Sequence, residues 1–370
     1  MPRGYVVRGD VSWPARVEQP QRPPALVYFD LNHFINLAKV AKGNAPDGYA
    51  VLLDECRLAK ADGRAVFPLS ATHAIEIADI GSFQQRSDIS AVMEELSDFQ
   101  YLLGRPIIIR LEVEAALDDV TGTELAVGEG IPLIGDSVLW AFGMRGGLTI
   151  QDDAQEAEQR LRDRLGNEFF DQMVAGFNRD AERMLLTGPD EQDKAELRKH
   201  GYAPERPYHH QEKRAQQERG QAAILDANPE YRGEKLRDLM NARETLIEFN
   251  EILANGIYER NTTLEELFGA GENVGKARDF NDAIPSIRVA VSLKTHYHRD
   301  GRHQWTSNDI HDIDALAVAV PYCDAVFADK AAWNALKTSR ELDVFETELP
   351  RRPQDLTQWL HDQPKPHRSS

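Results

Sequence analysis

The sequence SNDIHDIDALAVAVPYCDAVFADK, residues 307–330, combines a group of acidic side chains with two apolar elements. Asp309, Asp312 and Asp314 stand at the start of a predicted apolar helix, and Asp329 follows a short predicted strand. Neighbouring carboxylates repel one another and raise each other's pKa, so stability alone does not favour such a group. Because a divalent cation would relieve the repulsion, this stretch predicts a metal site that acids from elsewhere in the chain complete.

One such acid stands early in the chain. Residues 26–29 form an apolar run, and Asp30 follows at once. This pattern is typical of a buried strand with an acid at its carboxyl end. A helix is expected to follow over 31–39. Ligands of open α/β sheets bind at the carboxyl ends of the strands, so Asp30 is a candidate site residue.

A second strand and helix offer another acid. Residues 65–69 predict a strand, and Ser70 is the expected N-cap of a helix over 71–80. Glu76 lies about two turns into that helix. We expect it to join Asp30 at the edge of the sheet.

The choice among the late acids depends on helix geometry. Asp309 and Asp312 are three residues apart and share a helix face, whereas Asp314 lies about 200° round the axis from Asp312. Asp312 is therefore the favoured ligand and Asp309 the second choice. The alternative for Asp309 is an acid that the helix dipole favours at the N-terminus.

Three segments in this order resemble the PIN-domain nuclease family: FDLNHF at 29–34, SATHAIE at 70–76, and the stretch 308–330. The resemblance covers about 25–145 and 284–346. It implies a three-layer α/β/α sandwich with a mostly parallel central sheet, and Mg²⁺- or Mn²⁺-dependent cleavage of RNA. By the same resemblance the catalytic, metal-binding acids are Asp30, Glu76, Asp312 and Asp329. The shared helix face adds Asp309 as a further candidate ligand. Asp314-Ala315 also resembles an Asp-Ala pair that many PIN proteins carry here.

The chemistry agrees with the charge of such a substrate. Carboxylates and water suit the hard ions Mg²⁺ and Mn²⁺. A metal ion can neutralise the anionic phosphodiester, lower the pKa of a bound water and steady the leaving oxygen. Each acid also has a structural alternative: Asp30 as a helix cap, Glu76 as an exposed helix charge, and Asp329 as a turn residue. His33 and His73 are expected to be structural, because hard metals prefer oxygen.

Candidate substrate contacts come from the residues around these acids. The net charge of −18 argues against a nuclease, although a local surface can differ from the bulk. Residues 286–299 predict an amphipathic helix that leads into the acidic stretch. The candidate substrate-binding residues are Asn32, Lys294, Arg299, Asn308 and Lys330, with Tyr297 and Trp305 available for base stacking. The alternative is a solvated helix end.

The chain of 370 residues is long enough for two domains. The expected parts are an extended or disordered arm (1–24), the first part of a PIN-like domain (25–150), a helical insertion (151–283), the second part (284–349) and a polar tail (350–370). Within the first part we expect helices over 88–103 and 113–120, a strand at 107–109 and a loop-rich segment over 122–147. A short docking helix is expected around Leu356, Trp359 and Leu360. The insertion is expected to serve as a lid, a homodimer surface or a contact for a regulatory protein partner.

The remaining features indicate the compartment. No apolar run approaches the ~20 residues that span a membrane. Cys56 and Cys323 are far apart in sequence and suggest reduced thiols in the cytoplasm. The sequence thus predicts a cytoplasmic, metal-dependent endoribonuclease that hydrolyses RNA phosphodiester bonds, and by resemblance a toxin or phage-defence effector. The alternatives are a non-catalytic RNA-binding or scaffold protein on a PIN-like fold, and a phosphatase with Asp30 as nucleophile. Asn32 counts against the phosphatase, because an acid is needed at that position.

Overall fold

The computed structural model describes residues 11–123, 128–144, 154–203, 205–269 and 274–366. The described part of the chain is mostly helical, with a few small sheets that are largely parallel, and it belongs to the α/β class. None of its helices has the length and apolar character needed to cross a lipid bilayer.

A small parallel sheet organises the fold. Its strand order is β3-β2-β7, with β2 (Ala25–Phe29) in the centre. β3 (Ala65–Val66) pairs with the start of β2, and β7 (Ala325–Phe327) pairs with its end, so that Phe29 stands opposite Phe327. Because the strands are parallel, the carboxyl ends of β2 and β7 meet at one edge of the sheet.

Further pairing extends this sheet on both sides. Leu69 forms an isolated bridge with β4 (Tyr101–Leu102), and Ala325 forms one with Glu348. β4 is antiparallel to β6 (Ile134–Gly135), which precedes the short helix α6 (Val138–Ala141). The pair of β1 (Val17–Glu18) and β5 (Ile131–Pro132) lies apart from the central strands.

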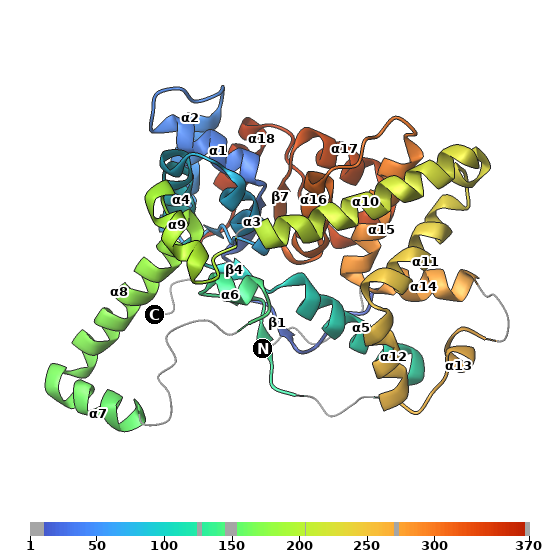
Figure 1. The fold of residues 1–370 in the computed structure, drawn as a ribbon, viewed down its shortest axis with the longest axis horizontal. Coiled ribbons are helices and arrows are strands. Elements are labelled where there is room, and N and C mark those ends of the chain that lie inside the picture. The colour runs from blue at the N-terminus through green and yellow to red at the C-terminus, as the bar shows by residue number, and fades with distance from the viewer. Residues whose placement is uncertain (1–10, 124–127, 145–153, 204, 270–273, 367–370) are drawn as a thin grey trace.

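Helices cover both faces of the sheet, because successive side chains of β2 point in opposite directions. Leu26 and Tyr28 belong to a core cluster with α15 (Pro285–Arg299), α16 (Ser307–Tyr322) and α17 (Lys330–Thr338). Val27 and Phe29 belong to another with α1 (Leu31–Val40), α2 (Tyr49–Ala61), α4 (Phe83–Ser97) and α18 (Pro353–His361). Figure 1 shows the two groups of helices on either side of β7.

The local predictions around the acids are confirmed. The strand predicted over 26–29 is β2, and the helix predicted after Asp30 is α1. The second strand is shorter than expected, and α3 (Ala71–Asp79) follows Ser70, which caps it in a capping box with His73. The expected docking helix is α18, which packs on α2.

The strand expected at 107–109 is wrong, because these residues lie in α5 (Arg105–Thr121). Pro106 stands in the first turn of this helix, where its missing N–H costs nothing. Ile108 packs into the core cluster of α15 and α16, whereas Ile109 packs into a third cluster. A helix that is covered on two sides has no clear amphipathic period, so its apolar run resembles a strand.

The N-terminal arm and the helix over 286–299 also differ from expectation. From residue 11 the arm is packed: Val11 and Val17 are buried, and the Ser12 N–H donates to the Ala283 carbonyl at 2.8 Å. Residues 1–10 lie outside the described part. α15 is the expected helix, but it is buried along almost its whole length because α11, α14, α16 and α17 surround it.

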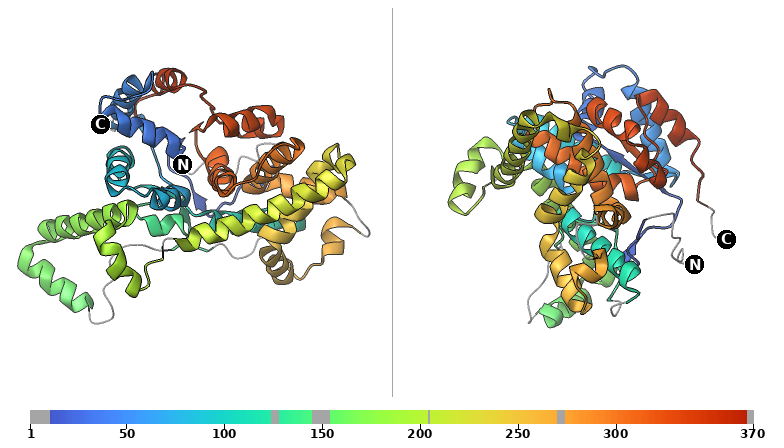
Figure 2. Two further views of the ribbon diagram at one scale, coloured as in Figure 1. Left: turned by 45° about the horizontal axis from the view of Figure 1, so that its top comes forward. Right: turned by 90° about the vertical axis from the view of Figure 1, so that its right-hand side faces the viewer.

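The described part of 151–283 is helical. Its helices are α7 (Ala154–Leu165), α8 (Asn167–Thr187), α9 (Glu191–Lys199), α10 (Glu205–Ala227), α11 (Leu236–Glu248), α12 (Asn250–Glu259), α13 (Leu264–Phe268) and α14 (Val274–Ala283). α7 and much of α8 project from the body of the molecule (Figure 1). α10 instead runs across the molecule and packs against α16 (Figure 2). The third core cluster joins α11 and α12 to α5 and α15, so this segment shares a core with the parts before and after it.

The docking of α18 gives a stability prediction. Leu356 is completely buried against α2, whereas Gln358 on the same helix is exposed. Leu356→Ala should lower the free energy of unfolding by about 2–5 kcal/mol, because it removes buried methyl groups and leaves a cavity. Gln358→Ala should change it by less than about 0.5 kcal/mol. Urea unfolding of both variants measures the difference, and equal effects would show that α18 does not dock as described.

Candidate metal centre

Two acids stand side by side because β2 and β7 are adjacent and parallel. Asp30 follows β2 and caps α1, and its carboxylate accepts from the Asn32 N–H and side-chain amide at 3.4 Å each. Asp329 follows β7 and caps α17 by accepting from the Ala332 N–H at 2.7 Å. The Asp30 N–H donates to the Phe327 carbonyl at 3.0 Å, which ties the two strand ends together. The cap role considered for Asp30 is thus real, Asp329 caps a helix rather than only forming a turn, and both roles coexist with a place at the sheet edge.

Two helices bring further acids to the same edge. Glu76 comes from the second turn of α3, and Asp312 comes from the second turn of α16. Asp30, Glu76 and Asp312 line one narrow pocket together with Tyr28 and Thr72. The Tyr28 hydroxyl lies 3.2 Å from Ser70 Oγ at its inner end.

The electrostatics show that these acids interact. Burial, and then the negative charge of Asp329, raise the pKa of Asp30 to about 6. Burial, followed by Asp30 and Asp79, raises the pKa of Glu76 to about 8. Burial also raises the pKa of Asp312 well above its usual value, with further contributions from Asp30, Glu76, Asp329 and Asp309. These are the effects expected of carboxylates that share a site.

No cation within the described part of the chain compensates this charge. None of the ion pairs among the described residues involves Asp30, Glu76, Asp312 or Asp329. An all-oxygen donor set suits Mg²⁺ or Mn²⁺ better than softer metals. However, no three His, Cys, Asp or Glu side chains of the described residues already stand close enough to hold one ion. The carboxylates would have to rotate toward an ion, and the fit rests on their oxygen chemistry and shared pocket.

Two buried histidines position the backbone in front of the acids. The His33 Nε2–H donates to the carbonyl of Ala328, which precedes Asp329, at 3.1 Å, and its Nδ1 accepts from the Tyr49 hydroxyl at 2.6 Å. The His73 Nε2–H donates to the carbonyl of Phe29, which precedes Asp30, at 2.7 Å. Burial lowers the pKa of both rings to about 4, so they are neutral near pH 7. Their place agrees with the predicted structural role.

The other late acids have different partners. Both oxygens of Asp309 are engaged: one accepts from the Thr306 N–H at 2.6 Å, and the other lies 3.3 Å from His303 Nε2. Burial alone would raise the pKa of Asp309, but the hydrogen bonds from His303 and Thr306 lower it. This arrangement matches the helix-terminus alternative. Asp309 remains close enough to Asp312 to raise its pKa.

Asp314 faces away from the acid pocket and belongs to a charged network. It lies 2.7 Å from Arg105 Nη1 and 3.0 Å from Arg214 Nη2. Burial would raise the pKa of Asp314, but the two guanidinium groups lower it far below its usual value. The spacing argument that separated Asp314 from Asp312 agrees with this placement.

The expected substrate contacts need a correction. Lys294 is buried, with its Nζ 2.6 Å from Glu244 and 3.3 Å from Glu218, so it does not reach the site mouth. Tyr297 and Trp305 are buried against each other and are unavailable to stack on bases. Lys294 is buried because α10 and α11 supply its two carboxylate partners, whereas Tyr297 packs against Trp305 and His303. Asn32, Arg299, Asn308 and Lys330 are exposed and remain candidate contacts.

A second, larger pocket beside the acids was not predicted from the sequence. It has a volume of about 640 Å³, and Thr72 and Ala315 line both pockets. Its other walls include Arg105 of α5 and Arg214 of α10, which lie far apart in the chain. No local pattern marks these residues, because only the packing of α10 on α16 brings them together.

No protein-family model matches this chain, and comparisons with curated proteins and with solved structures return no match. Its function is therefore argued from the chemistry of the site.

The raised pKa of Glu76 gives a prediction for the metal-free protein. Between about pH 4.5 and pH 8 the folded protein binds more protons at Glu76 than the unfolded chain, so stability falls as the pH rises. Glu76→Gln should therefore raise the melting temperature in EDTA at about pH 8.5 by roughly 2 °C or more, and leave it little changed at about pH 5. Mn²⁺ should stabilise the wild type at the higher pH and the variant much less.

Asp54→Asn is the matched control, because Asp54 is an exposed acid on α2. It should change neither the metal-free melting temperature nor the response to Mn²⁺. Loss of stability in Glu76→Gln at about pH 8.5 would mean that the carboxylate has a stabilising partner and is no uncompensated charge.

Proposed function

We propose that this protein is a metal-dependent endoribonuclease with a PIN-like arrangement, which hydrolyses RNA phosphodiester bonds with Mg²⁺ or Mn²⁺. One observation carries the proposal. Acids from four separate elements gather at the carboxyl edge of parallel strands, and no cation of the described residues neutralises them. Such an arrangement destabilises the metal-free protein. A divalent ion would relieve the repulsion among the carboxylates, and that relief would favour its binding.

The order of the elements supports the PIN-like assignment. Asp30 after β2, Glu76 on α3, Asp312 on α16 and Asp329 after β7 follow the sequence pattern of that family. The parallel order β3-β2-β7 with helices on both faces agrees with an α/β/α sandwich. The small size of the sheet and the large helical segment between its strands are departures from a compact domain.

These four acids would hold the ion, which when bound supplies charge neutralisation at the phosphate and a more acidic water. The chain's own contribution is positional. His33 and His73 fix the peptides before Asp329 and Asp30, and Asn32 orients the Asp30 carboxylate through two hydrogen bonds. Neutral histidines add no positive charge that would compete with the ion.

Two further observations support the wider proposal. Cys56 and Cys323 are buried free thiols, as expected for a protein of the reducing cytoplasm. On the projecting helix α8, Phe169, Phe177 and Met184 are more than half exposed. Exposed apolar side chains of this kind mark protein contacts, which supports a dimer or partner surface on the segment 151–283.

The test compares three acids of one helix in a cleavage assay. The purified protein should cut a mixed RNA pool only with Mn²⁺ or Mg²⁺. Asp312→Asn should lower the rate by more than about 100-fold, because even the partners of metal ligands cost 10–100-fold when they are changed. Asp309→Asn should keep most of the activity and lose about 0.5–2 kcal/mol of stability with its cap.

Asp314→Asn is the third arm. It should destabilise the protein by leaving Arg105 and Arg214 short of a partner, and retain metal-dependent cleavage at temperatures where circular dichroism shows it folded. Cleavage without metal, or an equal loss of activity in Asp309→Asn and Asp312→Asn, would count against the proposed site.

A further inference from the structure

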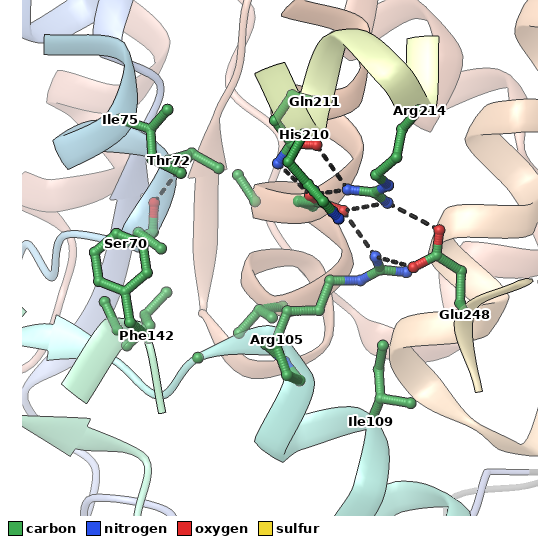
Figure 3. Close-up of a pocket in the computed structure, with 18 of the residues that line it drawn as sticks. Ser70, Thr72, Ile75, Arg105, Ile109, Phe142, His210, Gln211, Arg214 and Glu248 are labelled. Carbon is green, nitrogen blue, oxygen red and sulfur yellow. Dashed lines mark hydrogen bonds and ion pairs between the residues drawn. The ribbon is translucent and has the colours of Figure 1, made fainter. Parts of the chain in front are cut away.

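The larger pocket lies directly beside the acids. Thr72 and Ala315 line both cavities, so a ligand in the larger one would reach toward the acid pocket. Its volume of about 640 Å³ is in the range of about 300–1,000 Å³ that small-ligand sites occupy. In Figure 3, Ile75 and Phe142 stand on one side, and Gln211 and Arg214 of α10 stand on the other.

The pocket is lined by apolar side chains that include an aromatic ring. Ile75 and Ile109 contribute from α3 and α5, and Ile247 contributes from α11. Phe142, directly after α6, is 39 % exposed, and Ile247 is 47 % exposed. Large apolar side chains that stay open to a cavity suit a flat, apolar group such as a nucleobase, which stacks on aromatic rings.

The pocket also carries a fixed array of hydrogen-bonding groups. Arg105, Arg214 and Gln211 contact Asp314, and Arg214 also lies 3.0 Å from Glu248. These pairs cancel each other's charge and hold the side chains still. Arg105 Nε is buried and has no hydrogen-bond partner among the described residues. Fixed donors and acceptors of this kind bind the edges of an unpaired base.

A cation stands at the same pocket. Lys213 of α10 is exposed and lines the cavity, and no residue of the described ranges pairs with it. It can therefore contact a backbone phosphate, in contrast to the buried Lys294. The stacking wall, the polar wall and the free cation are the three parts that recognise a nucleotide within a single strand.

We propose that this pocket, which the inserted helices α10 and α11 help to line, binds one unpaired nucleobase of the RNA next to the scissile phosphate. The inference rests on the proposed ribonuclease function and adds a base-binding subsite to it. Residues of α3, α5, α10 and α11 line the pocket, so a base that enters it has to leave its pairing partner first, which costs least for a base that is already unstacked. The inserted helices then form part of the substrate site.

The test measures RNA binding by the full chain in EDTA, apart from cleavage. The probes are a fluorescent short single-stranded RNA, the same strand with one abasic position placed in turn along it, and a duplex. Phe142→Ala should weaken binding of the intact strand about 5- to 100-fold, the loss that base stacking predicts. At one position of the RNA, removing the base should weaken binding to the wild type. The same abasic RNA should bind Phe142→Ala as tightly as the intact strand does.

A matched pair on α11 supplies the control. Ile247 lines the pocket, whereas its neighbour Leu246 is 69 % exposed and is not among the lining residues. Ile247→Ser should weaken binding and Leu246→Ser should not. Lys213→Gln should lower the slope of log affinity against log salt by about 0.7, as expected for one phosphate contact with a single strand.

The outcomes separate the two proposals. Metal-dependent cleavage together with equal binding of intact and abasic strands would overturn the nucleobase pocket and leave the ribonuclease standing. Base-dependent binding that Phe142→Ala abolishes, without metal-dependent cleavage, would support the pocket and overturn the ribonuclease. Duplex binding as tight as single-strand binding would overturn the pocket.

Discussion

Repulsion among half-buried carboxylates, which no cation of the described residues compensates, is the constraint that sets the chemistry of this site. The pairing of Phe29 with Phe327 places Asp30 and Asp329 at the same strand edge. Burial and neighbouring negative charges then raise the pKa of Asp30 and of Glu76. The ionised forms of these two side chains therefore destabilise the metal-free protein. Binding of a divalent ion would offset this loss of stability in the active, metal-bound protein.

The surrounding structure supports this edge in two ways. Alternate side chains of β2 anchor helices on both faces, so the strand ends cannot move independently of the core. His33 and His73 then hold the peptides before Asp329 and Asp30 with one hydrogen bond each. The neutral rings stay buried because each nitrogen has a partner, and the acids therefore approach one another without a competing cation.

Features that depend on residues close together in the sequence could be predicted, whereas features that depend on packing between distant segments could not. An apolar run followed by Asp30, or Ser70 before a helix, is a local signal, and these elements formed as expected. The strand prediction for 107–109 was wrong because α5 is covered on two sides, so its apolar residues show no clear amphipathic helical period. The sequence prediction placed Lys294 at the mouth of the site, where it does not lie, and it did not include the larger pocket. Both features depend on how α10 and α11 pack against α15 and α16. No pattern within one segment encodes such packing.

The most direct test of the central claim is a crystal soaked in Mn²⁺ and measured for anomalous scattering. One or two strong peaks are expected among the carboxylates of Asp30, Glu76, Asp312 and Asp329, with oxygen–metal distances of about 2.1 Å. The same soak of Asp30→Asn should lose or weaken a peak. The account would be contradicted by a wild-type crystal at about pH 8 with no peak at this edge and with the acids paired to one another through shared protons.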